Sequence, residues 1–146
     1  MEIAKQLWLQ EQVRLRLITY CKAIDQKDWK LLISCFAEGH QHQHGPYKGD
    51  AKGFVEFAQS VLTKFIFTQH SLSNVVINLS EDGLSAKSEC NFSAVHRTAV
   101  SESGPATDMI VEGQYIDEFV CVDGTWLFKK RFGDNSWVRH ETVDME

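Results

Sequence analysis

The stretch DMIVEGQYIDEFVCVDGTWLFKKRF, residues 108–132, decides the fold that this chain is expected to adopt. Two β-rich runs lie on either side of Asp123-Gly124, a dipeptide typical of a tight hairpin turn. Two similar runs precede them, at residues 68–79 and 85–100, and turn residues separate each run from the next. The second half of the chain therefore predicts four consecutive antiparallel strands.

The first half of the chain has the pattern of helices. Apolar residues recur at three- and four-residue spacing from Val13 to Ile24, which predicts an amphipathic helix. Shorter helices are expected over residues 28–36, capped by Asp25 or Asp28, and over residues 51–65, capped by Asp50. Three helices followed by antiparallel strands predict one α+β domain over residues 1–146, with any cavity between the helices and a curved sheet.

Length, charge and composition narrow the class of protein. A chain of 146 residues, 43% hydrophobic and 24% charged, matches an ordinary globular domain. The net charge of -5 argues against nucleic-acid binding, which needs a basic face. No apolar run approaches the ~18 residues of a membrane span, and the dispersed cysteines are typical of free thiols in a reducing compartment. We expect a cytoplasmic protein with no nucleic-acid or membrane partner.

Period-two alternation assigns the strand side chains to two faces. Phe92 and His96 lie on the more apolar face of their run, and Tyr115 and Asp117 interrupt an apolar face of the next run. His70 joins them if a β-bulge changes the face of its strand. A few polar groups on apolar faces are typical of a small-molecule cavity, although each one alone is more often a hydrogen-bonded core residue.

The alternation of His40, His42 and His44 is a separate signal. In a strand these three imidazoles project to one side, where a pair of them could share a metal ion. A metal site usually needs a further ligand from another element, however, and this run adjoins a Gly-Pro turn. We expect no bound metal, and either exposed histidines or one inward histidine among the three.

Six segments together resemble the SnoaL-like division of the nuclear transport factor 2-like superfamily, and within it the scytalone and bile-acid dehydratases. The resemblance implies a cone-shaped, cystatin-like curved antiparallel sheet packed on three N-terminal helices. It also implies a homo-oligomer, either a dimer paired through its sheets or a trimer. The segments occur in order along nearly the whole chain: Tyr20–Trp29, Gly45–Gly49, Thr68–Asn74, Val95–Arg97, Gly113–Asp117 and Asp123–Trp126.

The same resemblance implies a set of site residues. Asp25 and His70 fall where both dehydratases carry an aspartate and a histidine. His96 matches a second histidine of scytalone dehydratase, where the bile-acid enzymes have an aspartate, and Tyr20 matches a tyrosine of the bile-acid enzymes. Ile24 stands where scytalone dehydratase has a tyrosine, so the substrate does not transfer. The four matching residues are the expected catalytic set. The expected substrate-binding residues lie in matching segments or on inward faces: His44, Tyr47, Asn74, Phe92, Tyr115 and Asp117.

Together these residues predict a cofactor-independent lyase or isomerase of the dehydratase kind. Dehydration beside a carbonyl needs a base, an acid and donors for the enolate, and an Asp–His pair supplies a base with a defined tautomer. The expected ligand is a small hydrophobic cyclic or polyketide-like molecule, and no metal or organic cofactor is needed. Two alternatives stay open: a non-catalytic ligand-binding module of the same fold, and a scaffold subunit similar to the β subunit of ring-hydroxylating dioxygenases.

Overall fold

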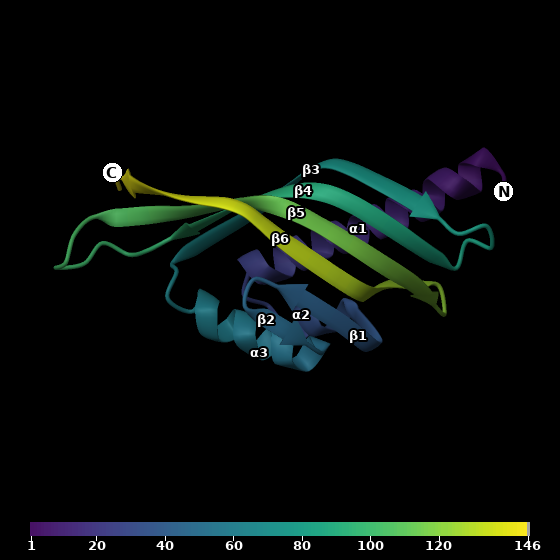
Figure 1. The fold of residues 1–146 in the computed structure, drawn as a ribbon, viewed down its shortest axis with the longest axis horizontal. Helices are drawn as coiled ribbons and strands as arrows, with labels where there is room; N and C mark the ends of the chain where they lie inside the picture. Colours follow the sequence, from purple (N-terminus) through teal and green to yellow (C-terminus); the bar gives the residue numbers. More distant parts are fainter. Residues whose placement is uncertain (146) are drawn as a thin grey trace.

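In the computed structural model, which describes residues 1–145, a long helix lies along one face of a curved sheet (Figure 1). That helix is α1 (Ile3–Asp25), and the short helices α2 (Trp29–Ser34) and α3 (Ala51–Leu62) lie beside it. Four long strands form most of the sheet, and a short hairpin of two more strands extends it. The strands are β1 (Phe36–His44), β2 (Tyr47–Gly49), β3 (Phe67–Leu79), β4 (Ser85–Arg97), β5 (Ala106–Val122) and β6 (Thr125–Val143).

The strand order is β2-β1-β6-β5-β4-β3, so the last strand lies in the middle of the sheet. The four predicted strands pair antiparallel as expected, and the curved α+β sheet with N-terminal helices is confirmed. The pair β1–β6 is parallel, which the local pattern did not indicate. The helix expected up to Phe36 ends at Ser34, because Phe36 pairs with Phe128 and begins β1.

The predicted helix signals are largely confirmed. The stripe from Val13 to Ile24 is buried against the sheet. Asp28 caps α2 by accepting a hydrogen bond from the backbone N–H of Leu31 at 3.0 Å, and Asp50 caps α3 through that of Gly53 at 2.8 Å. Asp25 is not a cap but the last residue of α1, which leaves its carboxylate available to the sheet.

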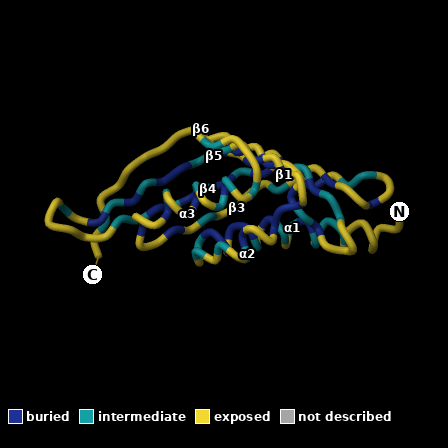
Figure 2. The backbone as a smooth tube through the Cα atoms, turned by 90° about the horizontal axis from the view of Figure 1, so that it is seen from below, coloured by how far each residue is buried: buried dark blue, intermediate teal, exposed yellow. Residues whose placement is uncertain are grey.

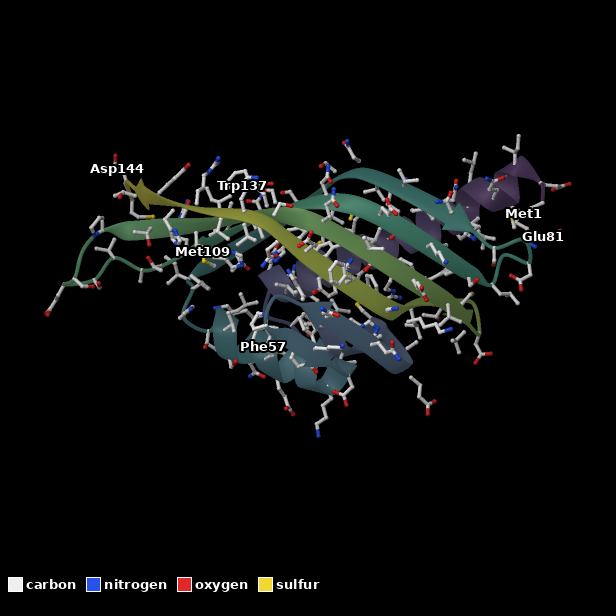
Figure 3. The ribbon with its side chains drawn as sticks, in the orientation of Figure 1. Met1, Phe57, Glu81, Met109, Trp137 and Asp144 are labelled. Atoms are coloured by element: carbon white, nitrogen blue, oxygen red, sulfur yellow. The ribbon has the colours of Figure 1, made fainter. Side chains whose placement is uncertain are left out.

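The core lies between α1 and the concave face of the sheet (Figure 2). Tyr20 of α1 is 1% exposed and sits among aromatic rings, with centroids 6.2 Å from Phe54, 6.2 Å from Tyr115 and 5.6 Å from Phe128. The C-terminal half of β6 is exposed and extends beyond the helices, with Trp137 on it (Figure 3). The end of the sheet next to α3 therefore holds the enclosed part of the molecule.

A bulge in β3 settles the face of His70. The register with β4 shifts between Ser73 and Val76, and Asn74 has a φ of 52°. Before the bulge, Thr68 and His70 face the helices; after it, Ile77 does. The bulge thus lets a polar site and an apolar core occupy the same face of one strand.

All four cysteines are free thiols, as expected. Burial raises the pKa of Cys21 to about 12 and that of Cys90 to about 11, so these thiols stay protonated at neutral pH. Within residues 1–145, no helix combines the length and the apolar character that crossing a membrane requires.

Candidate functional site

Asp25 and His70 form the centre of the site. The Oδ1 atom of Asp25 accepts a hydrogen bond from Nδ1–H of His70 at 2.7 Å and one from the hydroxyl of Thr68 at 3.1 Å. Its Oδ2 atom accepts from the backbone N–H of His70 at 2.9 Å. Because an ionised carboxylate only accepts, the neutral His70 ring carries its proton on Nδ1 and keeps a lone pair on Nε2.

His96 lies next to His70, with ring centroids 5.8 Å apart and an interplanar angle of 80°. Its Nδ1–H donates to the backbone carbonyl of Met109 at 3.2 Å, which leaves the lone pair on Nε2. Burial lowers the pKa of His96, and the neighbouring His70 lowers it further. His96 is therefore neutral at neutral pH and presents a hydrogen-bond acceptor.

His44 approaches the same space from β1. Its ring lies edge-on to Phe92 and to Tyr115, each with a centroid distance of 5.7 Å. Its Nε2–H donates a hydrogen bond to Oδ1 of Asn135 on β6 at 2.8 Å. Burial lowers the pKa of His44, with Arg131 contributing in the same direction. Phe92 itself stacks on Tyr115 at 4.3 Å and supports that ring from behind.

A cavity of about 120 Å³ joins these groups. Helix α1, helix α3 and the sheet contribute its walls, and Phe57 belongs to α3 (Figure 3). Of the predicted residues, it brings together three histidines and two tyrosines, while Asp25 lies behind His70. The lining consists of Tyr20, Ile24, His44, Phe54, Phe57, Ala58, Val61, Leu62, His70, His96 and Tyr115.

Asp117 does not line this cavity, contrary to its expected role. It is fully buried and forms a bidentate ion pair with Arg131, with N–O distances of 2.7 and 2.8 Å. The Arg131 guanidinium lies 3.8 Å from the ring centroid of Tyr115 and 4.2 Å from that of Tyr20. The sequence pattern missed Arg131 because a register shift opposite Phe119 turns it inward, out of phase with Phe128.

Tyr47 and Asn74 also lie outside the cavity. The Tyr47 hydroxyl donates to the backbone carbonyl of Asp50 at 2.7 Å, and its ring stacks on the outer side of Phe57 at 5.6 Å. Asn74 is exposed at the bulge of β3, beside a separate hollow of about 110 Å³. The two residues have structural roles here: Tyr47 holds the turn before α3, and Asn74 lies in the bulge of β3.

The expectation of exposed histidines before the Gly-Pro turn is wrong for His40 and His42, which are 3% and 2% exposed. His40 donates from Nδ1 to the carbonyl of Phe128 at 2.9 Å and accepts at Nε2 from Nδ1 of His42 at 3.0 Å. Burial lowers the pKa of His40 to about 4 and that of His42 to about 2. Over residues 1–145, no group of three or more potential ligands is arranged to hold a metal.

Two larger hollows lie on the surface. One, of about 700 Å³, runs between α1 and β3 and includes Asp25, Thr68 and His70 in its wall. His70 also lines the smaller cavity, so it borders both spaces. The other, of about 750 Å³, is lined largely by exposed side chains of β1, β5 and β6, among them Gln41 and Phe132, and contains none of the expected catalytic residues.

The fold resembles several solved structures. A provisionally assigned scytalone dehydratase from Novosphingobium aromaticivorans has a TM-score of 0.84 at 23% identity, over 98% of this chain and 94% of that one. A type 2 hexachlorocyclohexane dehydrochlorinase, LinA, gives 0.81 at 16% identity, over 97% and 94%. A provisionally assigned aromatic ring hydroxylase from N. aromaticivorans gives 0.75 at 19% identity, over 98% and 96%. These similarities concern the fold.

A comparison with curated proteins finds no match to the sequence. A family model described as a SnoaL-like domain matches residues 5–132, which is most of the chain. The match includes α1, the β1–β2 hairpin and the strands that carry His70 and His96. The chain therefore belongs to the SnoaL-like domain family.

Proposed function

We propose that this protein is a cofactor-independent lyase of the dehydratase type, acting on a small hydrophobic cyclic molecule. The observation that carries the proposal is the hydrogen bond between Asp25 and Nδ1 of His70 beside an apolar cavity. A carboxylate on Nδ1 sets the tautomer of the ring and stabilises its cation, so Nε2 becomes an effective base. Two proteins of similar fold are named a dehydratase and a dehydrochlorinase, names that denote eliminations.

In the first step, Nε2 of His70 removes a proton from a carbon next to a carbonyl group. The C–H bonding pair passes into an enolate, and Asp25 stabilises the resulting imidazolium at 2.7 Å. Tyr20 and Tyr115 line the same cavity, and burial raises the pKa of both hydroxyls well above the usual value. They therefore remain O–H donors and suit the developing oxyanion.

In the second step, the enolate expels the hydroxyl group of the next carbon. The C–O bond breaks, the imidazolium of His70 returns its proton to the departing oxygen, and water and a carbon–carbon double bond result. His96 is not the proton donor here, because burial lowers its pKa and leaves the ring neutral at neutral pH. Its neutral Nε2 instead suits the role of accepting a hydrogen bond from the substrate hydroxyl and orienting it.

The test is turnover of a panel of β-hydroxy cyclic ketones by the wild type, His70→Ala and a control. 3-Hydroxycyclohexanone is the first substrate, because its enone product absorbs in the ultraviolet. We expect His70→Ala to lower the rate by roughly 10²- to 10⁴-fold, whereas His140→Ala, at an exposed position of β6, keeps it. Equal rates for wild type and His70→Ala would refute the assignment of the base.

A non-catalytic ligand-binding module is the second candidate. The cavity of about 120 Å³ is smaller than the ~300 Å³ or more of typical ligand pockets and has apolar side chains of α3 in its wall, which suits binding of a small molecule. This reading expects ligand binding by wild type and His70→Ala with no turnover by either protein.

A further inference from the structure

Two histidines of the cavity are held by chemically different partners. His70 donates to the carboxylate of Asp25, which stabilises the imidazolium form. His44 instead donates from Nε2 to the amide oxygen of Asn135 at 2.8 Å, and a neutral amide stabilises the cation less than a carboxylate does, while burial lowers the pKa of His44. His44 is therefore suited to remain neutral, with its proton on Nε2 and a lone pair on Nδ1.

We propose that His44 selects the ligand, that Asn135 positions its ring so that Nδ1 accepts a hydrogen bond, and that the cavity takes a single-ring molecule bearing a hydroxyl group. The proposal rests on the cavity named in the proposed function. It adds a selecting residue, a positioning residue and the chemical class of the ligand.

The surroundings of His44 are built to hold this ring in one place. A Cβ atom at Gly133 would lie 2.6 Å from Cδ2 and 2.7 Å from Cγ of His44, so only glycine leaves room for the imidazole. Phe92 and Tyr115 meet the same ring edge-on, each at 5.7 Å. Asn135 is exposed on β6, so its contact with His44 is its main contribution to the interior.

The size and lining of the cavity define the ligand. Its volume of about 120 Å³ is close to the ~150 Å³ of an apolar protein cavity that accepts one benzene ring. Its walls are mostly apolar, with Phe54, Val61 and Leu62 among them. His44 and His96, whose pKa values burial lowers, line this space, and an acceptor nitrogen left unpaired beside apolar walls is unfavourable. A single-ring molecule that carries an O–H donor fits the volume of the cavity and supplies a partner for the acceptor.

Phenol and toluene test the proposal, because they share a ring and differ in the donor. Dissociation constants for both are measured by NMR titration at pH 8 for the wild type, Asn135→Leu and Asn135→Asp. Asn78→Leu is the matched control, since Asn78 is an exposed asparagine of β3 that is absent from the cavity lining. The imidazole nitrogen spectrum of wild type reports the tautomer of His44.

We expect phenol to bind at least about tenfold more tightly than toluene to wild type, to Asn78→Leu and to Asn135→Asp, which retains an acceptor oxygen. In Asn135→Leu the ratio falls below about threefold while toluene binding is unchanged. In wild type, His44 carries its proton on Nε2.

Three outcomes overturn the proposal: a proton on Nδ1 of His44, a phenol preference that survives in Asn135→Leu, or no preference for phenol in wild type, including no binding of either ring. These measurements need no turnover. Failure of the His70→Ala test therefore leaves this proposal standing, and failure here leaves the pair of Asp25 and His70 intact.

Discussion

The carboxylate of Asp25 lies 2.7 Å from Nδ1 of His70, across 45 positions of the sequence. Asp25 ends α1, and His70 lies in β3 just before the bulge at Asn74. The carboxylate also accepts from the hydroxyl of Thr68 and from the backbone N–H of His70. Three hydrogen bonds to one carboxylate fix the end of the helix on the strand, so structure and proposed chemistry depend on the same contact.

Replacing Asp25 by Asn should separate charge from shape. The amide keeps the size of the side chain but cannot stabilise an imidazolium, so we expect turnover of the proposed substrate to fall roughly 10²- to 10⁴-fold. Asp28→Asn is the control, because Asp28 caps α2 and lies outside the cavity lining. Steady-state kinetics measure the turnover rate of both variants. An Asp25→Asn rate within threefold of wild type would contradict the mechanism.

Stability should fall in acid because of His40. The folded chain keeps this histidine neutral, with a pKa lowered from 6.5 to about 4, whereas the unfolded chain protonates it below pH 6.5. The unfolded state thus binds more protons between these values, and the free energy of unfolding decreases as the pH falls. At 1.36 kcal/mol per pKa unit, His40 alone contributes a loss of about 3 kcal/mol between pH 7.5 and pH 4.

Urea unfolding at several pH values checks this expectation. His40→Gln should flatten the pH dependence, since glutamine does not titrate, and His140→Gln should leave it unchanged because His140 is exposed. Identical pH profiles for wild type and His40→Gln would mean that His40 is not held neutral by the fold.

The buried pair of Asp117 and Arg131 should behave as one unit. Asp117→Asn leaves the guanidinium unpaired in the core, and we expect a loss of about 3–5 kcal/mol in the free energy of unfolding. Asp117→Leu combined with Arg131→Met removes both charges and should cost clearly less than Asp117→Asn. Chemical denaturation of these variants measures both effects.

Asp108→Asn provides the reference for the buried pair. It breaks the partly exposed pair with Arg97, and we expect it to cost about 1 kcal/mol or less. Equal losses for Asp117→Asn and Asp108→Asn would contradict the dominant role of burial.

Gly133→Ala should act through His44. The added methyl group would lie 2.6 Å from the imidazole, so we expect a cost of about 1–3 kcal/mol and displacement of the ring from Asn135. In a His44→Ala background the same substitution should cost little, because the obstructing ring is gone. A double-mutant cycle by thermal unfolding measures this coupling, and additive effects would show that His44 is not the neighbour that matters.

Much of the fold could be predicted because its signals are local. The three- and four-residue spacing of apolar residues from Val13 to Ile24 predicts a helix, and the turn at Asp123-Gly124 between two alternating runs predicts a hairpin. Asp28 and Asp50 precede the helices that they cap. Inward faces followed from alternation as well, so the burial of Phe92 and His96 agrees with the pattern.

The rest depends on where segments far apart in the sequence meet. The bulge at Asn74 and the register shift opposite Phe119 each change the phase of a strand, and a two-residue period carries no mark of such a shift. For this reason the pattern left His70 open between two faces and missed Arg131. The parallel position of β1 beside β6 likewise follows from the assembled sheet and not from either strand alone.

The sequence by itself determined the three helices, the four long strands and the inward faces of β4 and β5, because repeating patterns of polarity set them. Only the tertiary structure decided what each inward polar group does. Asp117 pairs with Arg131, Asp25 with His70, and His44 with Asn135. A polar group that loses contact with water is stabilised by a hydrogen-bonding partner, and packing decides which group comes within hydrogen-bonding distance.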